Sequence, residues 1–464
     1  MIVMKFGGTS IDDAVAVQRV VEIVRSRLPL RPVVVVSAMG KTTKQLLETA
    51  RAASGGDLKT AAARLEALRT GHEELAQSAV RGWKGSPGET RVQHYFREMD
   101  QLLGGFSVLG ELSLRSQDKM LSYGELVSTS ILDEAFRENG VPSVWMDSRT
   151  LVITDEGYTR ASPVWERTRD SVRGNVVPLL GDGRVPVLQG YIGASTGGAT
   201  TTLGFEGSDY SATLVGAALG ASEIQIWKEV SGVMTADPDR VPGAWTVAHV
   251  SYEEASQLTY LGAKVLHTKS IGPARRHGIP IRVGNSTDAD APCSVVGDRS
   301  PADGGFVKSI AYKTPVALVR LVSPSGLEIH AFVRTVLERL HDASIEPIAW
   351  NAARDRITCV IGQESGWSGL PAVMENLADV TVFSDQAAVS LVGEGIRTQG
   401  GFAGRVLAAL DGVDVPWVSH GSSGIGITAV VGATVLDTVL KRLHGDFFRS
   451  PDPGMFIQPR KNRT

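Results

Sequence analysis

The run of residues 5–10 combines a lysine with two glycines directly after a strand-like segment at 2–4. Gly7 and Gly8 would let backbone N–H groups approach phosphate oxygens, and Lys5 would place a point charge against the β- and γ-phosphates of a nucleotide. A glycine turn after a strand is common, so this run alone does not establish a phosphate site. The spacing G-x-x-x-x-G-K-[ST] does not occur, which argues against a P-loop NTPase.

A second segment, residues 197–212, is dense in glycines and hydroxyl side chains and leads into an apolar helical stretch at 213–219. The simplest interpretation is that Ser208 or Asp209 caps that helix after a glycine-rich turn. Capping does not account for the threonines and glycines that precede it. Together with the carboxylate of Asp209, these groups suit a site that binds phosphate and orients cationic side chains.

Two further residues are candidates only in combination with others. Lys264 follows a Gly-Ala pair at an expected helix end, where a lone lysine is usually a solvated surface charge. Glu125 belongs to a Gly-Glu pair at the expected start of a helix, where a glutamate commonly complements the helix dipole. His72 and His267 lack partners at metal-ligand spacing, so we interpret both as structural, and we assign Trp227 to the core.

The elements that must position these residues alternate between short β-branched runs and helical periodicity. This alternation predicts an α/β fold, a three-layer sandwich around a mainly parallel sheet. The candidate residues fall in or near the loops that follow the strands. The elements expected are a helix at 13–27 and strands at 2–4, 33–36, 185–189, 224–227 and 280–283.

A turn-rich stretch follows residue 288 and predicts a domain boundary near residue 297. Beyond it, two segments repeat the order of a strand, a helix and two strands. The first copy is expected as strands at 316–322, 346–350 and 356–361 with helices at 327–341 and 371–377. The second is expected as strands at 388–392, 415–419 and 425–431 with helices at 402–410 and 435–443. Two copies are too few for a solenoid, so the repeat predicts paired compact modules whose interface can take a small ligand.

Composition limits the functional classes. The chain has 464 residues, a formal net charge of −3 and no long Lys/Arg run, so nucleic acid is not an expected partner. No stretch of about 18 apolar residues occurs, and the N-terminus lacks a basic start, so we expect neither membrane insertion nor secretion. The two cysteines, Cys293 and Cys359, lack metal-ligand spacing and favour a reducing, cytoplasmic location.

Taken together and in this order, the segments resemble the aspartate kinase family of the amino-acid kinase superfamily. Each motif is weak alone, but the combination is specific and runs over nearly the whole chain. The paired C-terminal modules resemble the ACT domains, of ferredoxin-like α+β fold, that bind amino-acid effectors in that family. The segments that carry the resemblance are residues 5–10, 35–43, 122–128, 200–212, 226–238 and 262–267.

The resemblance implies an amino-acid kinase fold and a defined reaction. Such an enzyme transfers the γ-phosphoryl group of ATP to the β-carboxylate of L-aspartate, the first step in the biosynthesis of lysine, threonine and methionine. Lys5 and Lys264 would stabilise charge on the transferred group, and Asp209 would hold the cationic groups in place. Mg²⁺ would bridge the phosphates, chiefly through nucleotide oxygens, and no protein ligand is assigned to it. The implied domains are a kinase domain at 1–297 and ACT domains at 298–384 and 385–464.

The resemblance also assigns binding residues, with Glu125 as the partner of the acceptor's ammonium group. The acceptor site comprises Ser37, Thr43, Glu125, Phe205 and Ser208. The nucleotide site comprises Gly7, Gly8, Lys228, Glu229, Met234, Asp237 and Lys264. Effector contacts are expected at Gly326, Leu327, Ser344 and Glu346. Ala352 stands where the family has a later acidic effector contact, so lysine, threonine, another effector or none remain open.

The chain departs from the family pattern at the acceptor site. The family usually has a carboxylate-binding arginine at the position of Phe205, and an aromatic ring cannot replace a bidentate pair. We expect another arginine, such as Arg160, to compensate. The alternative is that the pocket takes a different acidic amino acid. Lys228 and Glu229 stand where Thr-Asp is usual, which keeps a carboxylate and leaves ATP use expected.

A third interpretation is an amino-acid-sensing protein that has lost turnover. Degenerate kinases usually lose their phosphate-handling residues, but Lys5, Asp209 and Lys264 are all present here. A kinase is therefore the favoured interpretation. Because paired ACT modules often associate between chains, we expect a homodimer.

Overall fold

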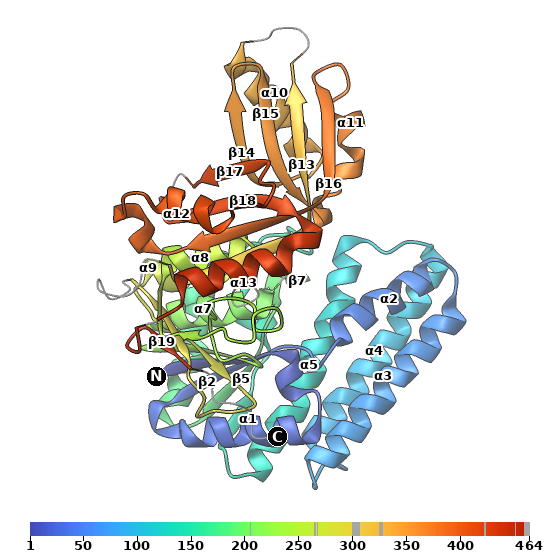
Figure 1. Cartoon of the computed structure of the whole chain (residues 1–464). Helices are drawn as coiled ribbons and strands as arrows, with labels where there is room; N and C mark the ends of the chain where they lie inside the picture. The colour runs from blue at the N-terminus through green and yellow to red at the C-terminus, as the bar shows by residue number, and fades with distance from the viewer. Residues whose placement is uncertain are drawn as a thin grey trace. The chain divides into compact units, whose positions relative to one another are not determined.

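The computed structural model describes residues 1–204, 206–263, 266, 268–298, 307–323, 328–421, 424–450 and 452–458. The chain divides into two compact units, whose elements are labelled in Figure 1. The first unit comprises Met1–Gly232 and Leu266–Asp298, and the second comprises Val233–Val265 and Arg299–Thr464.

The first unit is built on a mainly parallel sheet, as the sequence predicts. Its strands are β1 (Ile2–Phe6), β2 (Pro32–Val36), β3 (Ser143–Trp145), β5 (Val185–Gln189), β8 (Glu223–Lys228), β11 (Ile281–Asn285) and β12 (Ser294–Gly297). They follow the order β12-β11-β8-β1-β2-β5-β3, and only β12 is antiparallel to its neighbour β11. Every residue of β1, β2 and β5 is buried, so both faces of the sheet are covered there.

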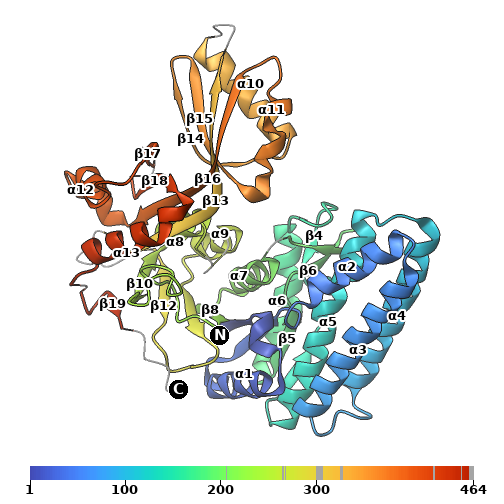
Figure 2. The same ribbon diagram turned by 45° about the vertical axis from the view of Figure 1, so that its right-hand side comes forward.

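Helices supply that cover, and a small second sheet flanks them. The helices are α1 (Ala14–Ser26), α2 (Thr42–Ser54), α3 (Leu58–Ala79), α4 (Pro87–Leu109), α5 (Leu114–Glu138), α6 (Trp165–Gly181), α7 (Gly207–Leu219) and α9 (Thr268–Arg276). Figure 2 shows α2, α3, α4 and α5 side by side, and α7 packs on β1, β2 and β8. The second sheet has the order β4 (Ile153–Thr154), β6 (Ile192–Ser195) and β7 (Thr200–Thr202). Trp227 on β8 is buried and stacks on Phe6, which confirms its place in the core.

The start expected for the helix that carries Glu125 is wrong. Glu125 lies in the interior of α5, about three turns beyond its first residue Leu114, so it does not complement a helix N-terminus. Gly124 does not mark a helix start, and the glycine at this position is explained by packing instead. A Cβ atom at Gly124 would lie 2.8 Å from the Cβ of Ala38, so only glycine lets α5 approach the loop after β2 this closely.

The second unit contains the expected repeat as one antiparallel sheet. The first copy comprises β13 (Ser309–Val322), α10 (Ile329–Asp342), β14 (Pro347–Ala353), β15 (Arg356–Gly362) and α11 (Leu370–Val373). The second comprises β16 (Asp379–Val392), α12 (Phe402–Ala409), β17 (Trp417–His420), β18 (Gly426–Gly432) and α13 (Leu436–Phe447). The strand order is β14-β15-β13-β16-β18-β17, so the long strands β13 and β16 join the two copies.

Three elements of the repeat differ clearly from expectation, and one of them is the strand expected at 316–322, which begins at Ser309. The helix expected at 371–377 ends at Val373, and Asn376 has a φ of 61°, in the left-handed region that a helix cannot continue through. The strand expected at 388–392 begins earlier, at Asp379, because it pairs with β13 over most of that strand's length. The second unit also contains α8 (Tyr252–Tyr260), β9 (Thr246–Val247), β10 (His249–Ser251) and β19 (Phe456–Ile457). No helix among the described residues is long and apolar enough to cross a membrane.

The close approach at Gly124 can be tested by substitution. We expect Gly124→Ala to destabilise the protein by about 1–3 kcal/mol, because the new methyl group overlaps Ala38 in a packed interior. Gly105→Ala, in α4, is the matched control, since a Cβ there meets nothing within 4 Å. The control should be neutral or slightly stabilising through helix propensity. Urea unfolding measures both, and equal effects of the two substitutions would contradict the packing account.

Candidate active site

A buried cluster of three charged side chains lies at the carboxyl end of the main sheet. Lys5 Nζ is 2.5 Å from Asp209 Oδ1, and Lys228 Nζ is 3.1 Å from Asp209 Oδ2. The side chains of Lys5, Asp209 and Lys228 are 8%, 2% and 18% exposed. The structure therefore brings together a predicted catalytic lysine, the predicted catalytic aspartate and a predicted nucleotide-binding lysine.

The cluster keeps its charges although it is buried. Burial alone would raise the pKa of Asp209, but the ammonium groups of Lys5 and Lys228 hold it below its usual value. Burial alone would lower the pKa of Lys228, but the carboxylates of Asp209 and Glu206 raise it above its usual value. Two ammonium groups share the carboxylate of Asp209, so these three side chains carry a net positive charge, which Glu206 partly offsets.

Strand pairing explains why these residues meet. β1 is parallel to β2 on one side and to β8 on the other, and Phe6 pairs with Val36 and Trp227. Lys5, Ser37 and Lys228 therefore lie at the same edge of the sheet, where neighbouring connections diverge and ligands commonly bind in α/β proteins. Asp209 reaches this edge from the first turn of α7. The interpretation of Ser208 or Asp209 as a helix cap is not supported, because the N-cap residue is Glu206 and no side chain caps the helix.

Gly8 brings the loop after β1 against the loop after β2. Gly40 N donates to Gly8 O over 3.0 Å, and a Cβ at Gly8 would lie only 2.4 Å from the carbonyl oxygen of Ala38. Gly7 lies beside the cluster, since a Cβ there would lie 3.8 Å from Lys5 Nζ. Of the two glycines predicted for the nucleotide site, Gly8 packs where a side chain would block the loops, whereas a Cβ at Gly7 would make only ordinary contacts.

Glu125 lies next to the cluster with one oxygen unused. Its Oε1 accepts from Ala38 N over 3.1 Å, whereas Oε2 is buried and has no hydrogen-bond partner among the described residues. Burial raises the pKa of Glu125 to about 8, although the bond from Ala38 and the charge of Lys5 oppose the rise. A buried acceptor of this kind suits a ligand that brings a positive donor.

Serine side chains connect the neighbourhood of Glu125 to the start of α7, which carries Asp209. Ser208 Oγ donates to Ser37 Oγ over 3.1 Å, and Ser128 Oγ donates to Ser37 O over 2.8 Å. Ser37 N donates to Phe6 O over 3.2 Å, which ties the loop after β2 to the end of β1. Ser37, Ser208 and Glu125, three of the predicted acceptor residues, are therefore brought together.

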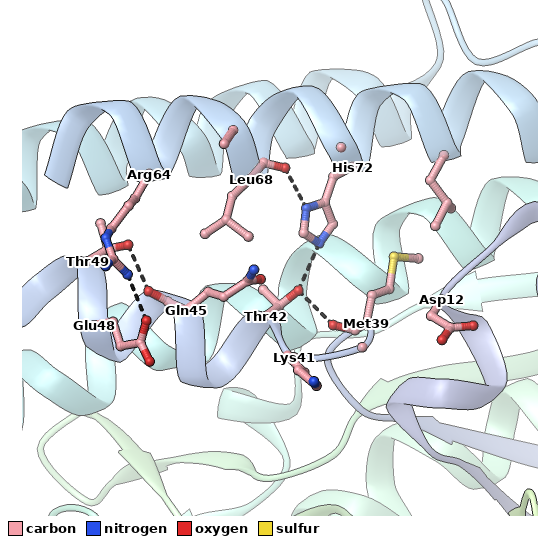
Figure 3. Close-up of a pocket in the computed structure, with 14 residues that line it drawn as sticks. Asp12, Met39, Lys41, Thr42, Gln45, Glu48, Thr49, Arg64, Leu68 and His72 are labelled. Carbon is pink, nitrogen blue, oxygen red and sulfur yellow. Dashed lines mark hydrogen bonds and ion pairs between the residues drawn. The ribbon is translucent and has the colours of Figure 1, made fainter. Parts of the chain in front are cut away.

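Thr43 is placed in the first turn of α2, near a separate cavity rather than in the cluster. A cavity of about 420 Å³ opens between α2 and α3, and none of the predicted site residues lines it. Figure 3 shows residues that line it, among them His72, whose Nδ1 lies 2.7 Å from Leu68 O and whose Nε2 lies 3.3 Å from Thr42 Oγ1. Burial lowers the pKa of His72, which agrees with a structural role.

The remaining predicted residues divide into four groups. Glu229 follows β8 and is exposed, with no contact that would tie it to the cluster. Met234 and Asp237 belong to the second unit, where Asp237 accepts from Tyr312 Oη over 2.7 Å. Ser344 and Glu346 are exposed at the turn between α10 and β14. Lys264, Phe205, Gly326 and Leu327 lie outside the described residues.

Sequence reasoning missed several residues of the site. Ser286 Oγ lies 2.8 Å from Ser10 Oγ and donates to Lys228 O over 3.0 Å, so it connects the loops after β1 and β8. Tyr191 packs against Gly207, ahead of Asp209, and burial raises its pKa. No motif marks these residues, because their partners are far away in the sequence. Among the described residues, no group of three or more His, Cys, Asp or Glu side chains is arranged to hold a metal ion.

Comparison with known proteins shows two matching families. The amino acid kinase family matches residues 1–285, and an ACT domain matches residues 389–447. Aspartokinase 2, chloroplastic, from Arabidopsis thaliana is 31% identical over 477 residues, covering 97% of this chain and 85% of the relative. Lysine-sensitive aspartokinase 3 from Escherichia coli (strain K12) is 30% identical over 461 residues, covering 97% of this chain and 99% of the relative.

Solved structures show the same likeness in three dimensions. E. coli aspartokinase III in complex with aspartate and ADP, in the R state, has a TM-score of 0.85 at 27% identity and covers 97% of this chain and 100% of its own. The same enzyme in complex with lysine and aspartate, in the T state, has a TM-score of 0.82 at 28% identity, and the match covers 97% of this chain and 99% of that chain. The match extends over both units, and the chain therefore belongs to the amino acid kinase family and, within it, to the aspartokinases.

Proposed function

We propose that this chain is an aspartate kinase, which transfers the γ-phosphoryl group of ATP to the β-carboxylate of L-aspartate. The observation that carries the proposal is the buried cluster of Lys5, Asp209 and Lys228, with Glu125 near enough to be affected by the charge of Lys5. The complex of the E. coli relative with aspartate and ADP supports both substrates. The products are ADP and an acyl phosphate.

The cluster suits this reaction because little covalent chemistry is required of the protein. A carboxylate is ionised near neutral pH, so it attacks the γ-phosphorus without a general base. One carboxylate oxygen bonds to phosphorus as the bond from phosphorus to the bridging oxygen breaks, and the electron pair stays on ADP. Lys5 and Lys228 neutralise charge on the transferred group, and Asp209 holds both ammonium groups in place. Lys264 is assigned as a further cation on resemblance alone.

Magnesium is proposed as the partner of ATP, and it supplies positive charge to the phosphate oxygens when it is bound. Both oxygens of Asp209 are engaged by lysines, so this carboxylate is not available as a simple ligand. Glu206 precedes α7 and has a buried Oε2 without a hydrogen-bond partner among the described residues. Glu206 is therefore the carboxylate that would hold the magnesium ion of the nucleotide.

We propose feedback regulation by an amino acid through the second unit. Segment 233–247, which includes the predicted nucleotide residues Met234 and Asp237, contacts elements of the ACT repeat within that unit. Thr235 Oγ1 lies 2.9 Å from His444 Nε2 on α13, and Arg240 pairs with Asp437 on the same helix. An effector that binds the repeat would act on segment 233–247 through these contacts. The lysine complex of the E. coli relative makes lysine the first effector to test, before threonine.

The proposal includes the domain organisation expected from the sequence, with a kinase domain at 1–297 and ACT domains at 298–384 and 385–464. It also includes a homodimer. The two cysteines, which form no disulfide, favour a cytoplasmic location, which is also part of the proposal. A kinase of another acidic amino acid is the second candidate function, and the phenylalanine at position 205 is the observation that favours it. An inactive amino-acid sensor is disfavoured by the intact charged cluster.

Trapping the acyl phosphate tests the reaction directly. Hydroxylamine converts an acyl phosphate to a hydroxamate, which forms a coloured complex with iron(III). The enzyme is therefore assayed with ATP, Mg²⁺ and each of L-aspartate, L-glutamate and N-acetylglutamate. We expect product with aspartate, and reduced product when lysine is added. Product only with another acceptor would move the assignment to that amino acid, and binding of amino acids without any product would indicate a sensor.

The raised pKa of Glu125 predicts a pH dependence of acceptor binding. Burial raises the pKa to about 8, so below this pH the free enzyme carries mostly neutral Glu125. An ammonium group binds the carboxylate form, so the KM for aspartate should fall as the pH rises from about 6 to about 9 and then level off. Glu125→Gln should raise that KM and remove the dependence, while the KM for ATP stays level.

The release of ADP, followed with a coupled assay, measures these constants at each pH. A KM for aspartate in the wild-type enzyme that stays level, or that rises with pH over this range, would show that Glu125 does not bind the ammonium group in this way.

A further inference from the structure

An acidic amino acid needs a second cationic contact that the residues described so far do not supply. In the proposed reaction Glu125 binds its ammonium group, and its β-carboxylate reacts beside the cluster of Lys5, Asp209 and Lys228. The α-carboxylate carries a full charge and needs a donor of its own, because a charge that is desolvated without a partner costs several kcal/mol. Both lysines are already shared with Asp209 and serve the phosphoryl group.

Asp118 is a buried carboxylate that the mechanism does not use. It lies on α5 seven residues before Glu125, so the two side chains share one face of the helix about 10 Å apart along its axis. Asp118 is fully buried, and three donors satisfy it. Its Oδ2 accepts from Thr159 N over 2.8 Å and from Thr202 N over 2.9 Å, and its Oδ1 accepts from Thr202 Oγ1 over 2.7 Å.

These bonds hold a turn that carries an arginine. Thr159 has a φ of 71°, which is unfavourable for a β-branched residue and persists only where the surroundings enforce it. Arg160 N donates to Gly157 O over 3.0 Å, and Ala161 N donates to Thr202 O over 2.8 Å. Asp118 and β7 therefore fix the turn at 157–160 from both sides.

The turn packs directly against the loop that leads into the acceptor site. A Cβ at Gly204 would lie 3.3 Å from Thr159 O and 3.6 Å from both Cα and Cβ of Arg160. Gly207 N donates to Gly204 O over 3.0 Å, so Gly204 lies one turn of chain before Ser208. The backbone of Arg160 is thereby placed against the segment that ends in the acceptor residue Ser208.

The side chain of Arg160 is available for a ligand. It is exposed and forms no hydrogen bond or ion pair with the described part of the chain. A guanidinium group presents parallel donors that match a carboxylate in a bidentate pair. The side chain of Arg160 starts beside Gly204, and so lies next to the loop that leads to the acceptor residue Ser208.

We propose that Arg160 binds the α-carboxylate of the acidic acceptor and sets the specificity for it, and that Asp118 is the positioning residue that holds the Arg160 turn. This inference rests on the proposed function, because it assigns a contact to the same acceptor. Arg160 would thereby take the role of the carboxylate-binding arginine that the family usually has at position 205, where this chain has phenylalanine.

Substitution of Arg160 provides the first test, with Arg167→Ala as the matched control. Arg167 lies on α6, is exposed, and has no hydrogen-bond or ion-pair partner in the described ranges. Arg160→Ala should raise the KM for aspartate about 10- to 100-fold, the loss expected for a charge-assisted bidentate contact, and should leave kcat and the KM for ATP within a few-fold. Arg160→Lys should recover part of the loss. An unchanged KM in Arg160→Ala would overturn the proposal.

A substrate analogue separates binding from a structural effect. L-Isoasparagine has an amide in place of the α-carboxylate and keeps the β-carboxylate. It should bind the wild-type enzyme weakly and should bind Arg160→Ala equally well, because the lost contact is the one to the α-carboxylate. If Arg160→Ala weakens the analogue as much as it weakens aspartate, the arginine acts on the fold and the proposal is wrong.

Asp118→Asn tests the positioning role. The amide keeps the shape of the side chain but loses one acceptor oxygen, so the KM for aspartate should rise, by less than in Arg160→Ala. In an Arg160→Ala background the same substitution should add no further increase, because the turn then has no arginine to position. Independent increases that multiply in the double variant would show that Asp118 acts elsewhere.

Calorimetric titration of aspartate into each variant keeps this test distinct from that of the reaction. Wild-type enzyme that binds aspartate without forming product would contradict the proposed function, and the comparison with Arg160→Ala would still decide the role of the arginine. Wild-type enzyme that neither binds nor phosphorylates aspartate would overturn both proposals.

Discussion

Asp209 holds the ammonium groups of Lys5 and Lys228 in a buried place where charged lysines are costly unless they are paired. This contact constrains much of the first unit. It requires β1 and β8 to be parallel neighbours that end together, and it requires α7 to begin at the same edge of the sheet. The loops after β1 and β2 then have to pass each other closely, which is why Gly8 packs onto the carbonyl of Ala38.

Helix α5 supplies the second constraint, because one of its faces serves both ends of the acceptor. Glu125 offers a buried oxygen without a partner, and Asp118 holds the turn at 157–160 against the loop before Ser208. The helix can approach the loop after β2 because Gly124 has no side chain there. The positions of Lys5 and Lys228 therefore depend on where two strands end, whereas the position of Glu125 depends on α5. The hydrogen bond between Ser37 and Ser208 connects these two parts of the site.

The residues that belong to local patterns were predictable, and those defined by distant partners were not. Lys5 and Asp209 follow from glycine-rich loops after strands, and the β-α-β-β repeat follows from hydrophobic runs. The Gly-Glu pair at 124–125 predicts a helix start, but Gly124 instead permits a close contact with Ala38, which is remote in sequence. Ser286 meets Ser10 across 276 positions, and Asp118 meets Thr202 across 84, so no spacing could reveal either. Likewise, segment 233–247 contacts α13 through Thr235 and His444, which are 209 positions apart.

The most direct test of the central claim, that Asp209 acts through the lysines it holds, is a double-mutant cycle of Lys5→Met and Asp209→Asn on kcat. We expect Lys5→Met to lower kcat about 100- to 1000-fold. The further fold loss in kcat from Asp209→Asn should be at least about tenfold smaller in the Lys5→Met background than in the wild-type enzyme. Lys44→Met, at an exposed lysine of α2, is the control and should leave kcat unchanged. If the two losses multiply independently, Asp209 does not act through Lys5 and the account is contradicted.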